Sequence, residues 1–335
     1  MERSVAIVIL NWNGKRFLER FLPVLIARSQ EPNTFIVVAD NGSTDGSVEW
    51  LQESHPDIEL IEFDTNYGFT GGYNRALRLI PADYYILLNS DVEVGENWLE
   101  PLISFMEENP DVGICVPKVR SFDNPEYFEH AGAAGGFIDR YGYPFCRGRI
   151  MSKIEKDYGQ YDQETEVFWA SGVSLMIRSG IFDNLGGFDD HFFAHMEEID
   201  LCWRAKLLGY QVWVVPQSVI YHVGGGTLPN NSPHKLYLNF RNNLLMLYKN
   251  LPPRDKRKTI FIRKSLDNLA SMVYLFTGKW SYFKAVHKAH RDYRKLRKEV
   301  EISITPDHPP TGVYKGTILF DRKPFSNGRL RKRFS

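Results

Sequence analysis

Runs of large apolar residues that end in polar turns recur along the first third of the chain. Residues 5–10, 35–39, 58–63 and 84–89 read as strands, and the last is apolar or aromatic nearly throughout, as in a fully buried strand. Between them, apolar residues at helical spacing, such as Phe17, Phe21 and Leu25, predict amphipathic helices. Strand, polar turn and helix repeat four times, which predicts a doubly wound α/β sheet.

The rest of the chain gives a less regular pattern. A helix over residues 97–109 and a strand over 112–119 are expected, followed by an apolar stretch at 173–177, a helix from 197 to about 209 and a strand at 211–215. Residues 121–165 are rich in Gly, Pro, Tyr and Phe and have weak periodicity, so we expect a long loop that serves acceptor recognition. Residues 254–277 and 279–300 are expected to be helical.

Polar side chains that could serve in binding or catalysis follow these strands. Asn89-Ser90-Asp91 ends the strand at 84–89, so Asp91 should lie at the carboxyl edge of the sheet, where open α/β sheets bind ligands. Asp40 ends the second strand and could accept a hydrogen bond from a nucleobase, although a turn or N-cap role would also explain it. The first strand is followed by NWNG rather than GxGxxG, which argues against NAD binding.

A second polar cluster begins the helix at residue 197. Glu197, Glu198 and Asp200 lie in its first turn, and the helix dipole explains one such acid more easily than three. Glu198 and Asp200 are two positions apart and cannot share a helix face. One could therefore point into a cleft while the other makes a structural bond, for example from Asp200 to Arg204. His222 follows a strand and precedes three glycines, so a metal or phosphate role and a structural role are both open.

Length and composition set limits on these possibilities. The 335 residues suit one large domain with an appendage, and three widely spaced cysteines form neither a metal nor a disulfide framework. Such cysteines fit a reducing, cytoplasmic location. We expect no signal peptide, and no apolar run approaches the length of a membrane span.

Charge divides the chain into an acidic body and a basic tail. Residues 1–248 carry 19 Lys and Arg against 34 Asp and Glu, whereas residues 249–335 carry 22 against 7. The tail could form ordinary solvated helices that pack on the body, or it could bind anionic lipid at the inner face of the cell membrane. No nucleic-acid-binding module is recognisable, so nucleic acid is not an expected partner.

Seven motifs in order resemble the family 2 glycosyltransferases, and most closely their bacterial rhamnosyltransferase-like branch, which builds cell-surface polysaccharides. These motifs cover roughly residues 4–250 and are VAIVILNWNG, VVADNGSTDGS, NYGFTGGYN, ILLNSDVEV, SGVSLMIR, GGFDDHFFAHMEEIDLCWR and YHVGGGT. The resemblance implies a GT-A fold, with a Rossmann-like mixed sheet flanked by helices. It implies a nucleotide-sugar-binding half at 1–120 and an acceptor and catalytic half at 121–250, which leaves 251–335 as a basic helical extension.

The resemblance also implies roles for individual residues. A divalent cation, Mg²⁺ or Mn²⁺, would be bound by Asp91, the last acid of the family's Asp-X-Asp motif, and by His222. The first acid of that motif is Asn89 here, which leaves less negative charge for the ion. The remaining site residues are implied to bind the donor (Asn11, Asp40, Asn41, Asn66, Asn74, Asn89) or the acceptor (Trp169, Gly172, Glu197).

The catalytic base of the family is the Asp of a Glu-Asp pair. This chain has Glu197-Glu198, so Glu198 takes that position and Asp200 remains a competing candidate. The implied reaction is an inverting, metal-dependent transfer of a sugar, with rhamnose as one candidate, from a dTDP- or UDP-sugar to a saccharide or lipid-linked saccharide. Two other classes stay open: a catalytically silent sugar-nucleotide binder and a sugar nucleotidyltransferase.

Overall fold

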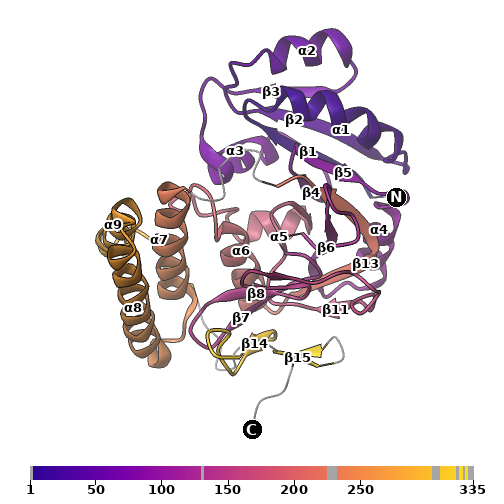
Figure 1. Ribbon diagram of the computed structural model, residues 1–335. Coiled ribbons are helices and arrows are strands. Elements are labelled where there is room, and N and C mark those ends of the chain that lie inside the picture. The colour runs from indigo at the N-terminus through magenta and orange to yellow at the C-terminus, as the bar shows by residue number, and fades with distance from the viewer. Residues whose placement is uncertain are drawn as a thin grey trace.

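A computed structural model describes residues 3–129, 132–224, 232–303, 310–321, 324–326 and 329–330. Its centre is a nine-stranded mixed sheet in the order β11-β13-β6-β12-β4-β1-β2-β3, with β5 paired to β13 (Figure 1). The neighbours β4, β1, β2 and β3 run parallel, as the repeated strand–helix pattern predicted. Strand β12 is antiparallel to both β4 and β6, which makes the sheet mixed.

The elements of this layer have the following bounds. The strands are β1 (Val5–Asn11), β2 (Thr34–Asp40), β3 (Glu59–Glu62), β4 (Tyr84–Leu88), β5 (Val92–Val94), β6 (Val112–Ser121), β11 (Thr165–Glu166), β12 (Ser174–Arg178) and β13 (Gln211–His222). The helices that flank them are α1 (Lys15–Ala27), α2 (Ser47–Ser54), α3 (Gly68–Leu77), α4 (Glu100–Glu108), α5 (Ser179–Asn184) and α6 (Glu197–Leu207). Helix α4 is shorter than the predicted 97–109.

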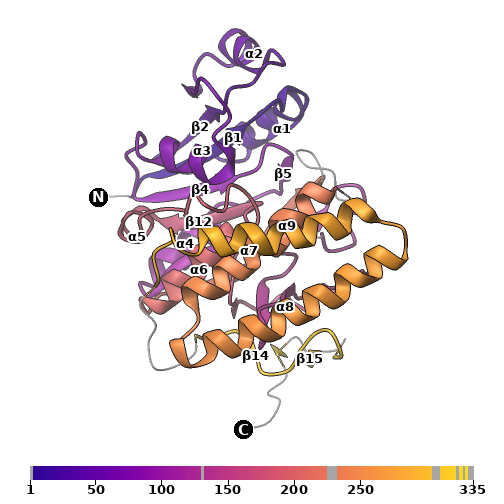
Figure 2. The same ribbon diagram turned by 90° about the vertical axis from the view of Figure 1, so that its left-hand side faces the viewer.

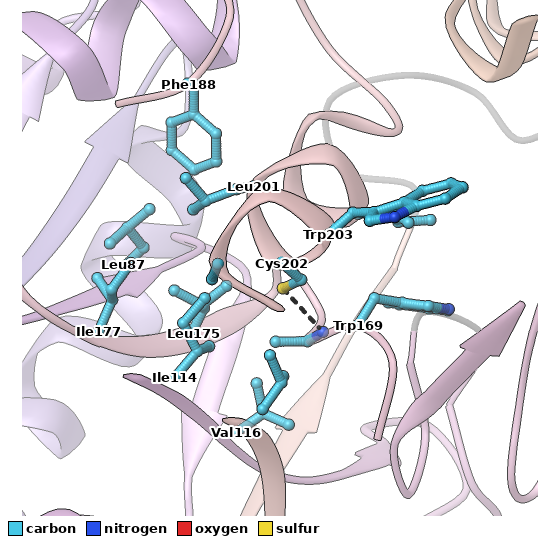
Figure 3. Close-up of a cluster of buried hydrophobic side chains, with 14 of the residues drawn as sticks. Leu87, Ile114, Val116, Trp169, Leu175, Ile177, Phe188, Leu201, Cys202 and Trp203 are labelled. Atoms are coloured by element: carbon cyan, nitrogen blue, oxygen red, sulfur yellow. Dashed lines mark hydrogen bonds between the residues drawn. The ribbon is translucent and has the colours of Figure 1, made fainter. Parts of the chain in front are cut away.

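Both faces of the central sheet are buried, which explains why its strands are apolar throughout. Alternate side chains of β4 point to opposite faces. Tyr85 and Leu87 join one core with residues of α3, α5 and α6, whereas Ile86 and Leu88 join a second core with residues of α1 and α4. Figure 3 shows the first core, in which Leu201 and Cys202 of α6 lie over strands β4, β6 and β12.

Residues 121–165 are more ordered than the predicted loop. They contain most of a second, five-stranded sheet in the order β10-β9-β8-β7-β14. Its strands are β7 (Gly136–Asp139), β8 (Pro144–Cys146), β9 (Arg149–Ile150), β10 (Lys153–Ile154) and β14 (Val313–Tyr314), and a separate hairpin pairs β15 (Phe325–Ser326) with β16 (Arg329–Leu330). Strands of two to four residues are too short to give a clear period-two pattern, which is why the sequence did not reveal them.

Three long helices form a further layer beside the sheet. They are α7 (Pro233–Asn250), α8 (Pro253–Phe276) and α9 (Trp280–Leu296), and Figure 2 shows them face on. The sequence predicted α8 and α9 but not α7, whose buried positions include Asn242, Asn243 and Asn250 and therefore form no simple apolar stripe. Among the residues that the structure describes, no helix has both the length and the apolarity needed to cross a bilayer.

Candidate active site

The carboxyl ends of β1 and β2 bring two predicted donor-binding residues together. Asn11 and Asp40 are paired in register, and Asn11 Nδ2 donates to Asp40 Oδ2 at 2.9 Å. The other carboxylate oxygen of Asp40 accepts from the backbone N–H of Ser43 at 2.8 Å. Asp40 lines a cavity of about 340 Å³ with Ser43, Glu62 and Phe63 among the other walls. The cavity therefore lies at the edge where the sequence expected a nucleoside.

Two of the predicted donor-binding asparagines, Asn41 and Asn74, make structural hydrogen bonds. Both amide hydrogens of Asn41 bond within the next turn, to Asn66 Oδ1 at 3.1 Å and to the Gly68 carbonyl at 3.0 Å. Both amide hydrogens of Asn74 reach the turn before α6, at the Phe188 carbonyl and at Asp190. These amides are buried and engaged within the protein, and the donor-binding roles of Asn41 and Asn74 stay predictions. Asn66 is partly exposed, and its Oδ1 caps the backbone N–H of Gly68 at 2.8 Å.

Asp91 and His222 meet where β5 pairs with the end of β13. His222 Nε2 lies 3.1 Å from Asp91 Oδ1, and its other ring nitrogen, Nδ1, lies 3.3 Å from Glu129 Oε2. Burial alone would lower the pKa of His222, but the two carboxylates outweigh it and raise that pKa to about 9. The sequence predicted the Asp91–His222 pair. It did not predict Glu129, which lies in the weakly patterned region after β6.

This arrangement fits a divalent cation. A carboxylate oxygen and an imidazole nitrogen face each other, and a second carboxylate orients the imidazole from behind, as in many metal sites. Oxygen and imidazole ligands suit Mn²⁺, and Mg²⁺ sites commonly use one or two carboxylates plus phosphate oxygens and water. Within the described part of the chain, no cluster of three or more His, Cys, Asp or Glu is arranged to hold an ion by itself. Residues 225–231, which include the last part of YHVGGGT, lie outside the described residues.

The start of α6 carries a strained backbone and unsatisfied polar atoms. Phe193, His195 and Met196 have φ angles of 64°, 70° and 72°, a left-handed conformation that costs free energy in residues other than glycine. In this segment and directly after it, three buried side-chain atoms have no hydrogen-bond partner in the described structure: His195 Nε2, Glu197 Oε2 and Glu198 Oε2. Buried polar atoms of this kind are rare and call for a missing partner, such as a ligand or water.

Burial also changes the protonation of the two glutamates. It raises the pKa of Glu198 to about 7. Burial and then the charge of Glu198 raise the pKa of Glu197 well above the ordinary range of a carboxyl. Burial therefore favours the neutral form of both carboxyl groups, and acids whose pKa values are raised in this way are typical of acid–base sites.

Helix α7 holds the strained segment in place from one side. Asn242 Nδ2 lies within hydrogen-bond distance of three backbone carbonyls, at 2.9 Å from Phe192, 2.8 Å from Ala194 and 2.7 Å from His195. From the other side, the backbone N–H of Phe69, at the start of α3, donates to the Phe193 carbonyl at 2.9 Å. Sequence reasoning missed Asn242. Its only signal is an asparagine pair, NN, inside a helix, which helix propensity does not favour.

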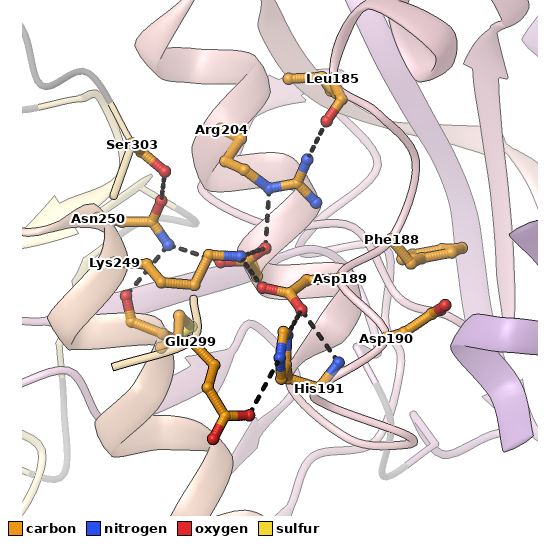
Figure 4. Close-up of polar contacts among 12 residues, drawn as sticks. Leu185, Phe188, Asp189, Asp190, His191, Arg204, Lys249, Asn250, Glu299 and Ser303 are labelled. Carbon is orange, nitrogen blue, oxygen red and sulfur yellow. Dashed lines mark hydrogen bonds and ion pairs between the residues drawn. The ribbon is translucent and has the colours of Figure 1, made fainter. Parts of the chain in front are cut away.

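Asp200 belongs to a buried ionic network rather than to a cleft, and Figure 4 shows its partners Arg204, Lys249 and Asn250. Its fully buried carboxylate accepts from Arg204 Nε at 2.8 Å, Lys249 Nζ at 3.0 Å and Asn250 Nδ2 at 2.7 Å. Lys249 also pairs with Asp189, and this outweighs burial and lowers the pKa of Asp189. The bond to Arg204 confirms one predicted alternative. The competing prediction, Asp200 as the base, does not fit a carboxylate that is occupied on both oxygens.

Two of the predicted acceptor residues differ in their surroundings: Gly172 lies beside Glu198, whereas Trp169 packs in the interior. A Cβ added to Gly172 would lie 3.8 Å from Glu198 Cβ and 3.5 Å from Phe69 Cζ, so Gly172 borders the start of α6. Trp169 is instead a packing residue. Its indole N–H donates to the Phe137 carbonyl at 2.9 Å, and its buried ring covers Gly136, where a Cβ would lie 2.1 Å from the ring (Figure 3). The acceptor role expected for Trp169 stays a prediction, and its indole N–H is already bonded within the protein.

Short contacts connect the two acidic groups across the sheet edge. The backbone N–H of Asn89, two residues before Asp91, donates to the Val173 carbonyl at 3.0 Å. Val173 follows Gly172, which borders Glu198. On the other side, Ser90 Oγ would lie 3.1 Å from a Cβ added to Gly14, in the turn after Asn11. The two residues before Asp91 thus contact the turn after Asn11 on one side and the segment beside Glu198 on the other.

Comparison with known proteins agrees with these features. The family model described as glycosyl transferase family 2 matches residues 4–186, more than half of the chain. The N-acetylglucosaminyl-diphospho-decaprenol L-rhamnosyltransferase of Mycobacterium tuberculosis is 26% identical over 236 residues, covering 66% of this chain and 76% of that protein. Rhamnosyltransferase WbbL of Escherichia coli is 24% identical over 219 residues, covering 63% of this chain and 80% of that protein.

Solved structures with the same fold have lower identity and therefore show the fold alone. S. aureus TarS 1–349 in complex with UDP-GlcNAc has a TM-score of 0.57 at 14% identity, covering 89% of this chain and 84% of that one. GalNAc-T7 with UDP, GalNAc and Mn²⁺ has a TM-score of 0.57 at 15% identity over 74% of this chain, which spans about half (48%) of that chain. The mixed sheet is thus that of the GT-A glycosyltransferases, and the chain belongs to glycosyl transferase family 2.

Proposed function

We propose that the protein is an inverting, metal-dependent glycosyltransferase that acts in surface polysaccharide synthesis. It transfers a sugar, with rhamnose as the first candidate, from a dTDP- or UDP-sugar to a saccharide or lipid-linked saccharide. We place the donor nucleotide in residues 1–120, the acceptor and catalytic groups in 121–250, and the helical extension in 251–335. The reaction would take place in the cytoplasm, where nucleotide sugars are made.

One observation carries this proposal: Oε2 of the partly exposed Glu198 is buried and unsatisfied, near the sheet edge that holds Asp91. A buried carboxylate oxygen without a partner is costly unless a ligand supplies a donor. An acceptor hydroxyl is such a donor. The relative from Mycobacterium tuberculosis is, by its name, a rhamnosyltransferase for an N-acetylglucosaminyl-diphospho-decaprenol, which is a sugar on a lipid diphosphate. The two acids belong to segments that touch through Asn89, Val173 and Gly172.

Glu198 would act as the general base. An acceptor hydroxyl is a poor nucleophile until its proton is removed during attack, and a carboxylate with a pKa near 7 is suited to removing it at neutral pH. Attack on the face opposite the departing diphosphate inverts the anomeric carbon. Asn242 and the contacts of Phe193 would hold the base in line, and such positioning supplies a large part of the rate.

Asp40 and Asn11 would bind the nucleoside, and Asp91 and His222 would hold the cation, with Glu129 orienting His222. When bound, a divalent cation neutralises the negative charge of the departing diphosphate. Asn89 reduces the protein charge in this region, so diphosphate and water must provide more of the coordination.

A transfer assay with two variants tests the assignment of the base. The assay uses dTDP-rhamnose and an N-acetylglucosaminyl-diphospho-polyprenol, with UDP-sugars as alternative donors. Glu198→Gln should lower kcat about 10²- to 10⁴-fold with little change in Tm, because it removes the base and keeps the shape of the side chain. Asp200→Asn should mainly lower Tm, since it breaks a buried ionic network.

The two variants can also contradict the proposal. If Glu198→Gln retained near-normal transfer while folded Asp200→Asn lost it, the base would be Asp200. If the wild type neither transferred nor hydrolysed any sugar nucleotide in the presence of Mn²⁺ or Mg²⁺, the protein would not be an active transferase of this class.

A further inference from the structure

Helix α8 presents an exposed apolar face. The large side chains on it recur at helical spacing and are Phe261, Leu269, Met272, Val273 and Phe276, followed by Trp280 at the start of α9. Phe276 is 82% exposed, Leu269 65% and Trp280 60%. We call these six residues the α8 face. Contiguous exposed apolar residues of this size usually mark a surface that contacts a partner or a membrane.

The opposite side of α8 is fixed to the protein body. Arg263, Asp267 and Ser271 are buried at four-residue spacing. The Arg263 guanidinium lies 3.5 Å from the centre of the Tyr143 ring and donates to the Gly142 carbonyl at 3.2 Å. Asp267 accepts from Arg263 at 3.0 Å and contacts His290 of α9 at 3.1 Å. The helix therefore has a fixed rotation, and the α8 face points away from the body.

The exposed Asp, Glu, Lys and Arg side chains between residues 256 and 291, around the α8 face, are all positive, while Asp255 and Asp292 flank this segment. Between residues 256 and 291 the only acidic residue is Asp267, which is buried, whereas the same segment carries nine Lys and Arg. Exposed members of this set include Arg257 and Lys258 on α8 and Lys279 and Lys284 around the α8–α9 turn. Such a surface would repel a second copy of itself but would attract a surface of negative charge.

We propose that the α8 face docks on the surface of an anionic lipid bilayer. Aromatic and aliphatic side chains would enter the interface between headgroups and acyl chains, while the surrounding lysines and arginines contact anionic headgroups. Figure 2 shows that the α8–α9 turn lies at the same end of the helical layer as the start of α7, where the chain arrives after β13 and His222. The protein would thus meet the bilayer without a spanning helix.

Vesicle flotation of the full-length protein, without substrates, tests this inference independently of the proposed function. The wild type should float with vesicles of phosphatidylcholine and phosphatidylglycerol but not with phosphatidylcholine alone, and added salt should weaken the association. Leu269→Ser combined with Phe276→Ser should weaken binding to the anionic vesicles at least about tenfold, because two large apolar side chains no longer leave water.

A matched control removes similar side chains elsewhere. Leu79, 62% exposed, and Tyr158, 79% exposed, lie outside α8 and α9, so Leu79→Ser with Tyr158→Ser should bind vesicles like the wild type. Circular dichroism and Tm check folding, and Phe276→Ser alone is used if the double variant unfolds. The inference is wrong if the wild type does not float, if the α8 variant floats as well as the control, or if light scattering shows a dimer that the α8 variant abolishes.

Discussion

At the residue scale, the environment separates groups that look alike in the sequence. Glu197, Glu198 and Asp200 are three acids in one helical turn, yet Asp200 is neutralised by Arg204 and Lys249 while Glu198 keeps an unsatisfied oxygen. The sequence could predict that one acid bonds Arg204, because the i to i+4 spacing is local. It could not predict Lys249, whose contact depends on how α7 ends against α6.

The raised pKa of Glu198 leads to a prediction about pH. The base must be deprotonated, so kcat/KM should increase with pH and level off above about 7, falling about tenfold per pH unit well below that value. The measurement is a rate profile from about pH 5.5 to pH 8.5 at saturating metal. The Glu198→Gln variant is the control, and its residual rate should lack this dependence. A profile that stays nearly flat down to pH 5.5, as expected for a Glu with an ordinary pKa of about 4.3, would contradict the role of burial.

At the scale of elements, polar side chains on buried helix faces position the site. Helix α7 was invisible to pattern analysis because Asn242, Asn243 and Asn250 occupy buried positions where apolar residues would be expected. The structural bond of Asn74 was equally hidden in the sequence. This residue lies in a glycine-rich segment typical of ligand binding, but its amide bonds the Phe188 carbonyl more than a hundred residues later. In contrast, the proximity of Asp91 and His222 was predictable. Both follow strands whose carboxyl ends lie at the same edge of the sheet, and this does not depend on the structure of the chain between them.

Replacing Asn242 should therefore impair catalysis as well as stability. Asn242→Ala leaves the carbonyls of Phe192, Ala194 and His195 without this donor, so we expect a loss of about 1–3 kcal/mol in the free energy of unfolding. Displacement of Glu198 should lower kcat up to about 10²-fold with a smaller effect on the donor KM. Transfer kinetics and urea denaturation measure the two effects.

The control for this variant lies one turn away on the same helix. Asn239 Nδ2 bonds the Lys235 carbonyl of the same helix rather than the segment before α6, so Asn239→Ala should change both quantities little. If Asn242→Ala lost stability but kept the wild-type kcat, the segment before α6 would be held well enough by α3, and Asn242 would be purely structural.

At the scale of the whole molecule, the main sheet was more predictable from the sequence than the smaller sheet and the two sides of α8. Repeated apolar strands and strand-end polar residues predicted the mixed α/β sheet, because both signals are local and the sheet is buried on both faces. The small β7–β10 sheet has strands too short to detect, and its partner β14 comes from residues 313–314. The basic tail was visible as charge, but only the structure separates the buried side of α8 from its exposed face.

The central claim is that Asp91 and Glu198 serve one site, with the cation and diphosphate on one side and the base on the other. Anomalous diffraction from crystals of the protein with Mn²⁺ and a nucleoside diphosphate tests it most directly. The account predicts a manganese peak at coordination distance, about 2.0–2.2 Å, from Asp91 and His222, with the diphosphate bound to it and the Glu198 carboxylate facing the sugar position. A manganese peak elsewhere, or a Glu198 carboxylate separated from the diphosphate by packed core, would contradict the account.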